Sequence, residues 1–141
     1  MIDTSPDGFA EIARQTYQSL PKAFRQLSAD VVIRIANVAE LAVLEDLGIQ
    51  DPMELLGLYQ GIDVTQKSGF DVIPAHDMVF LYRQPILNYW VEGNDALEDI
   101  IAHVLIHEIG HHFGLSDDAM HALEEEARAE DRTWYRGRSD D

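Results

Sequence analysis

The segment from 95 to 113 constrains the fold more than any other part of the sequence, because it predicts a long helix that is buried on nearly all sides. Such a helix lies at the centre of a domain rather than on its surface. Asn94 or Asp95 is predicted to cap its start, and Glu98 would complete a variant of the capping box. Gly114 is the expected stop. The apolar residues that cover most of its circumference are Leu97, Ile100, Ile101, Val104, Leu105, Ile106 and Ile109.

Three segments predict strands around this helix. VVIRIA (31–36) and MVFLYR (78–83) are rich in β-branched and apolar residues. ELLGLYQGI (54–62) is predicted as a further strand, whose glycines allow another backbone to approach closely. The turn-rich stretch from 63 to 77 is predicted as a loop. A few strands among several helices indicate the α+β fold class.

Shorter helices are predicted elsewhere. A first helix starts at Thr4 or Ser5, and Pro21 stops it. The segment 37–52 favours a short helix that ends near Gly48, and 85–90 forms a helical turn. Together with the strands, these elements are expected to form one domain over residues 1–141, with a loose polar tail at 131–141.

Composition limits the classes of function. The chain has 141 residues, 46% of them hydrophobic, which is enough for one sizeable core. Its net charge of −16 would repel phosphate backbones, so nucleic acid is not an expected partner. There is no cysteine, so any bound metal must use histidine and carboxylate ligands. The sequence shows no signal-peptide pattern and no membrane-length apolar run, so a cytoplasmic protein without membrane contact is expected, and a monomer.

The string HEIGHHFGLSD (107–117) predicts a zinc site at the end of the long helix. His107 and His111 are four residues apart, so both imidazoles lie on one helix face and can share a cation. Glu108 lies beside that face, where it can take a proton from a metal-bound water. Gly114 can adopt a left-handed conformation and turn the chain, which then returns past the metal at Asp117. A carboxylate at that position is an acceptable third ligand.

Several neighbouring residues leave alternatives open. Asp117 is also a favoured N-cap for a last helix that extends to about residue 129, a role that Ser116 or Asp118 can also fill. His103 lies one turn before His107 and could approach the site. His112 is interpreted as a hydrogen-bonded core residue or a group that supports the ligands. His76 and His121 are expected to be ordinary. A more distant carboxylate ligand could come from Glu124, Glu125, Glu126 or Glu130, although such a charge run is usually a solvated face.

The spacing HExxHxxGxxD, formed by His107, Glu108, His111, Gly114 and Asp117, resembles the metzincin metallopeptidase motif with its last histidine replaced by aspartate. With DMVFLYRQPIL and LLGLYQGI upstream, the sequence more closely resembles the small bacterial minimal-zincin family, over roughly residues 8 to 125. The resemblance implies a mixed sheet of three to four strands packed against the active-site helix. It also implies His107, His111 and Asp117 as zinc ligands and Glu108 as the catalytic acid/base.

The sequence therefore predicts a zinc-dependent peptidase that acts on a peptide or protein substrate. Tyr82 or Tyr89 could stabilise the oxyanion, and Met120 could serve as a Met-turn or simply pack in the core. The alternative is a non-catalytic, zinc-stabilised acidic protein that binds a partner. Glu108 favours catalysis, because a purely structural zinc site needs no general base.

Overall fold

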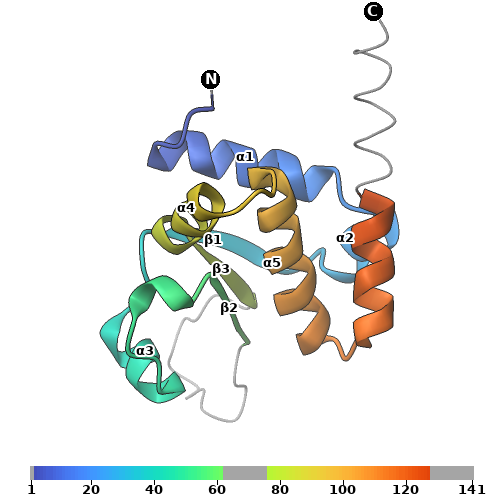
Figure 1. Cartoon of the computed structure of the whole chain (residues 1–141). Coiled ribbons are helices and arrows are strands. Elements are labelled where there is room, and N and C mark those ends of the chain that lie inside the picture. Colours follow the sequence, from blue (N-terminus) through green and yellow to red (C-terminus); the bar gives the residue numbers. More distant parts are fainter. Residues whose placement is uncertain (1, 62–75, 128–141) are drawn as a thin grey trace, which may run out of the picture.

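The computed structural model describes residues 2–61 and 76–127, in which helices surround a small sheet (Figure 1). The sheet contains β1 (Val32–Ala36), β2 (Gly57–Gln60) and β3 (Met78–Tyr82) in the order β1-β3-β2. β3 is central; it pairs parallel with β1 and antiparallel with β2. The α+β fold class and the small mixed sheet are confirmed.

The helices occupy most of the remaining described chain. A last helix covers 117–127, where the described residues end. The others are α1 (Pro6–Gln18), α2 (Lys22–Leu27), α3 (Leu41–Leu47), the 3₁₀ turn η1 (Pro52–Glu54), α4 (Arg83–Glu92) and α5 (Leu97–His112).

α5 lies at the centre of the fold, as its all-round apolar pattern predicts. It packs against β2 and β3 on one side and against α1 and α4 on others, and the last helix runs beside it (Figure 1). Each of the seven predicted apolar residues of α5 is buried. Gly57 allows the close approach between helix and sheet, since a Cβ there would lie 2.4 Å from Val104 Cγ1. A Cβ at Gly57 would also lie 2.9 Å from the Phe80 carbonyl oxygen of β3, so the predicted close approach of another backbone is confirmed for this glycine.

Capping residues and glycines in the sequence predicted some ends of helices and strands correctly and others incorrectly. Ser5 caps α1 by accepting a hydrogen bond from the Gly8 N–H at 3.1 Å, and Gly48 ends α3 in the left-handed conformation. The predicted cap of α5 is wrong, because Ala96 is the N-cap and no side chain bonds the first turn. The strand predicted over 54–62 is shorter, since η1 ends at Glu54 and β2 spans only Gly57–Gln60.

Two helices differ in extent from the sequence-based prediction. α4 is a full helix of 10 residues rather than a single turn, and α2 was not predicted. Most of the predicted loop 63–77 and the whole predicted tail 131–141 lie outside the described residues. In the part of the chain that the structure describes, no helix is long and apolar enough to cross a membrane.

Candidate metal centre

The end of α5 has the geometry that Gly114 predicts. Gly114 has a φ of 76°, and its N–H donates to the His111 carbonyl at 3.1 Å. The Leu115 N–H donates to the Gly110 carbonyl at 2.9 Å, which completes a Schellman motif. This motif ends α5 and directs the chain into the last helix.

The last helix begins at Ser116 and packs back along α5. The Ser116 hydroxyl accepts the Ala119 N–H at 3.0 Å, so Ser116, not Asp117, is the side-chain cap. Met120 is fully buried against Gly110, where an added Cβ would lie 2.6 Å from the Met120 sulfur. Farther along, Glu124 contacts His103 and His107, so the two helices run antiparallel. The core-packing interpretation of Met120 is confirmed.

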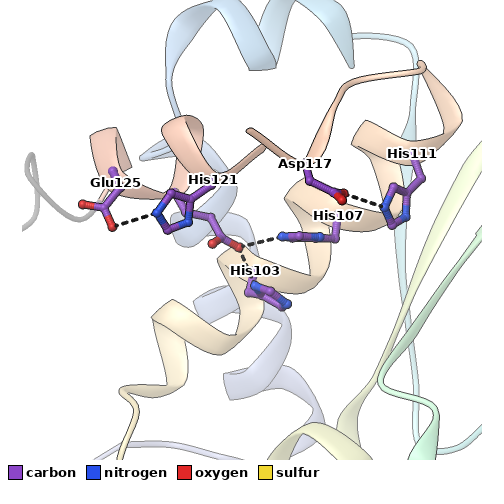
Figure 2. Close-up of polar contacts among 7 residues, drawn as sticks. His103, His107, His111, Asp117, His121 and Glu125 are labelled. Atoms are coloured by element: carbon purple, nitrogen blue, oxygen red, sulfur yellow. Dashed lines mark hydrogen bonds and ion pairs between the residues drawn. The ribbon is translucent and has the colours of Figure 1, made fainter. Parts of the chain in front are cut away.

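The three predicted ligands lie near one another but are not in contact as a set. His107 and His111 follow each other along α5, with Asp117 beside His111 (Figure 2). His111 Nε2 lies 4.0 Å from Asp117 Oδ1. Both side chains are exposed, at 61% for His111 and 93% for Asp117. The predicted ligand set stays a prediction.

A different set of ligand atoms does come together, between α5 and the last helix, one turn of α5 before the motif position. His103, His107 and Glu124 offer ligand atoms that all lie within 4.8 Å of one another, the only such group among the described residues. Glu124 Oε1 lies 3.2 Å from His107 Nε2 and also contacts His103 Nδ1. The Glu124 side chain is only 10% exposed. It is therefore held between the two imidazoles rather than in solvent, where the charge run at 124–126 suggested it would lie.

His107 is the residue that the two sets share, and charged residues of both sets affect its pKa. Burial lowers its pKa, and the nearby His103 charge lowers it further. Glu124 and Asp117 raise the pKa, while His111 lowers it. The net effect is a lowered pKa, which favours the neutral imidazole that binds a metal.

Glu108 lies toward the sheet side of α5. Its Cγ lies 3.7 Å from the position that a Gly57 Cβ would occupy, and its carboxylate accepts a hydrogen bond from the backbone of Tyr59 in β2. Burial raises the pKa of Glu108, while the Tyr59 hydrogen bond and the His111 charge lower it by less. Glu108 is therefore a half-buried carboxylate beside His111, as a general base at the predicted site would be.

A cluster that the sequence did not predict holds β2 against the end of α5. The Tyr59 hydroxyl donates to Asp77 Oδ2 at 2.6 Å, and the Tyr59 ring stacks on His112 with centroids 4.0 Å apart. His112 Nε2 lies 3.4 Å from the same Asp77 oxygen. His112 is thus a partly exposed supporting residue rather than a core residue. Because Tyr59 also bonds Glu108 through its backbone, this cluster fixes the strand that orients Glu108.

The tyrosines proposed for the oxyanion differ in position. Tyr89 is half exposed on α4. Tyr82 is buried beside Ala39 and Leu44, and burial raises its pKa, with smaller contributions from Glu40 and Glu108. Tyr82 is therefore the one whose hydroxyl interacts with the charge of Glu108.

The chain belongs to the zincin-like metallopeptidase family, whose family model matches residues 28–127. The matched region contains the complete HExxHxxGxxD spacing and the last helix as far as Ala127. Membership of this family implies zinc as the metal. Comparison with curated protein sequences found no significant match.

The residues around His107 fit zinc in donor chemistry. Zinc takes imidazole nitrogens and carboxylate oxygens at roughly 2.1 Å in tetrahedral geometry, which separates two ligand atoms by roughly 3.4 Å. The distance from His107 Nε2 to Glu124 Oε1, 3.2 Å, is close to this spacing. The distance from His111 Nε2 to Asp117 Oδ1, 4.0 Å, is slightly longer, and both exposed side chains can close it by rotation.

Proposed function

We propose that the protein is a zinc-dependent peptidase in which His107, His111 and Asp117 hold the metal and Glu108 is the general base. The observation that carries this proposal is the position of Glu108. Its carboxylate is half buried beside His111 and bonded to an edge strand of the sheet. Membership of the zincin-like metallopeptidase family supports the same assignment.

Bound zinc would supply a water of lowered pKa and polarise the carbonyl of the scissile peptide bond. Glu108 would accept a proton from the attacking water as its oxygen bonds to the carbonyl carbon. As the C–N bond breaks, Glu108 would return that proton to the leaving nitrogen. A carboxyl pKa that burial raises suits both transfers, because the group then holds and releases a proton more evenly near neutral pH.

The substrate is proposed to be a peptide or protein that lies beside β2. This strand is at the edge of the sheet and borders Glu108, so an extended chain could add to it. Tyr82 is the proposed oxyanion donor, since its hydroxyl interacts with the charge of Glu108 and a phenol is protonated at neutral pH. That the substrate is not nucleic acid, that the chain is monomeric and that it acts in the cytoplasm stay predictions, of which the net charge of −16 supports the first.

The proposal is tested by zinc content and a peptidase screen on the wild type, Glu108→Ala and Glu98→Ala. Glu98 is an exposed glutamate in the first turn of the same helix and serves as the matched control. Glu108→Ala should keep zinc and fold and lose activity by roughly 10²–10⁴-fold, while Glu98→Ala should retain activity. Loss of zinc from Glu108→Ala would make Glu108 a ligand, and full activity would remove it from the mechanism.

A second candidate function is a non-catalytic, zinc-stabilised acidic protein that binds a partner. The contact of Glu124 with His103 and His107 favours it, because these donor atoms could hold zinc apart from Glu108, whose carboxylate is bonded to β2. The two candidates differ in the effect of removing the metal from protein that stays folded. A structural site would affect only stability, whereas the catalytic proposal requires that zinc restore hydrolysis at unchanged fold.

A further inference from the structure

Along one side of α5, histidines recur at every fourth residue. His103, His107 and His111 lie on successive turns, and a carboxylate from the following segment faces each end of the row (Figure 2). Asp117 lies next to His111, and Glu124 lies between His103 and His107. His107 therefore has a histidine and a carboxylate on each side.

We infer that the chain has a second metal position, formed by His103, His107 and Glu124, which overlaps the motif position and competes with it for His107. Its three ligand atoms already lie within 4.8 Å of one another. Two nitrogens and one carboxylate oxygen are a donor set that zinc accepts, and they leave room for a fourth ligand.

The anchoring of Glu124 supports this position. The last helix carries Glu124 on the face that packs against α5, and its side chain is only 10% exposed. The nearby fit of Met120 against Gly110 fixes the register between the two helices. The carboxylate is therefore held where the imidazoles can reach it, whereas an exposed surface carboxylate would first have to be ordered.

The two positions exclude each other. A neutral imidazole has a single nitrogen lone pair, so His107 can bind one cation at a time. The chain should therefore bind one zinc, in either position, and never two around His107. This conclusion concerns metal binding alone and does not rest on the proposed peptidase activity.

The two positions also differ in their relation to Glu108. The carboxylate of Glu108 is bonded to the backbone of β2 and interacts with the charge of His111. β2 and the last helix lie on opposite sides of α5 (Figure 1). A cation bound by His103, His107 and Glu124 would thus lie away from the general base Glu108, in a position that does not support catalysis.

The test titrates metal-free full-length variants with Zn²⁺ alone by calorimetry, and with Co²⁺ by visible absorption. H111A/D117A removes the motif position; both side chains are exposed, so the fold is not at risk. This variant should still bind one equivalent. Adding H103A, also at an exposed residue, should then abolish binding. The control H121A/E125Q removes the pair whose nitrogen and oxygen lie 3.7 Å apart on the last helix, and should bind like the wild type.

The outcomes separate this inference from the proposed function. If H111A/D117A keeps its helical circular dichroism but binds no metal, the second position does not exist. If H111A/D117A binds and the added H103A leaves binding unchanged, the residual ligands lie elsewhere and the inference is wrong. If H103A/E124Q binds no zinc whereas H111A/D117A does, the motif position fails and the second position stands. Two equivalents in the wild type would contradict the sharing of His107.

Discussion

The two neighbourhoods of His107 contrast in how firmly their side chains are held. On the side of Glu124, the carboxylate is nearly buried and contacts two imidazoles. On the side of Asp117, the carboxylate is 93% exposed and lies 4.0 Å from its nearest imidazole nitrogen. We call the side of Glu124, with its nearly buried carboxylate, the closed side, and the side of Asp117, with its exposed carboxylate, the open side.

The two sides differ in the burial of their carboxylates and not in their number of ligands. Each side offers three protein ligands, which leave one position of a tetrahedral zinc free. Glu108 lies near the open side, because its carboxylate interacts with the charge of His111 and accepts a hydrogen bond from the backbone of β2. The contrast teaches that an HExxH helix can place further donor atoms beside a motif histidine, on the side away from the expected general base.

The largest expected effect comes from His107, because both sides need it. His107→Ala should lose stoichiometric zinc binding, with affinity reduced by roughly several powers of ten. His103→Ala and His111→Ala each remove one side only, so each should retain one equivalent. Calorimetric titration of the three metal-free variants measures this pattern, and helical circular dichroism controls for folding.

The comparison between the single variants decides whether the closed side binds at all. Should His111→Ala lose zinc as completely as His107→Ala, the open side would be the only metal position. Should His103→Ala be the variant that loses zinc, the closed side would be the only one. His121→Ala is the matched control, since its imidazole is exposed and pairs with the exposed Glu125 of its own helix.

Sequence patterns suggested the residues of the open side more directly than the contact of Glu124 with α5, and the reason is physical. His107, Glu108 and His111 share one helix, so their relative positions follow from the helical period alone. The turn at Gly114 was also predictable, because glycine favours the left-handed conformation that a Schellman motif needs. The fit between Met120 and Gly110 sets where Glu124 meets α5, and no local period encodes that register.

Similar reasons explain the errors elsewhere in the fold. The strands at 32–36 and 78–82 follow from their apolar, β-branched patterns and were predicted within one residue, and the central helix was predicted within two. Asn94 or Asp95 was expected to cap α5, yet the cap is Ala96, which makes no side-chain bond. The contact of Tyr59 with Asp77 joins residues that are 18 positions apart, across a segment whose course the sequence does not fix.

A smaller effect distinguishes the roles of adjacent residues at the start of the last helix. Ser116 provides the cap, so Ser116→Ala should cost about 1 kcal/mol of stability and leave zinc affinity unchanged. Asp117→Ala should keep stability and weaken zinc binding at the open side. Asp117→Ser should behave like Asp117→Ala, because a neutral hydroxyl is a poor substitute for a carboxylate ligand.

Thermal unfolding of the metal-free variants and zinc titration measure the two effects separately. Since the closed side can still hold zinc, the Asp117 variants are best compared in the His103→Ala background. Equal zinc affinity of His103→Ala with and without Asp117→Ser would mean that Asp117 is not a ligand. A stability loss in Asp117→Ala as large as that in Ser116→Ala would mean that both residues cap the helix.

The smallest effect, and the one with opposite signs on the two sides, comes from neutralising Glu108 and Glu124 in metal-free protein. Burial raises the pKa of Glu108, so the folded chain holds this proton more firmly than the unfolded chain. The carboxyl group therefore costs stability that accumulates as the pH rises above the unfolded pKa and is complete above the folded pKa. Glu108→Gln should raise the melting temperature at pH 7, and this gain should fade as the pH falls below the usual carboxyl range, where both states are protonated.

Glu124→Gln should instead lower the melting temperature, because its carboxylate accepts contacts from His103 and His107. Each shift should be at most a few degrees, since about 1 kcal/mol moves a domain of this size by roughly 4 °C. Shifts of the same sign at pH 7 would show that the two carboxylates do not differ in the way their surroundings indicate.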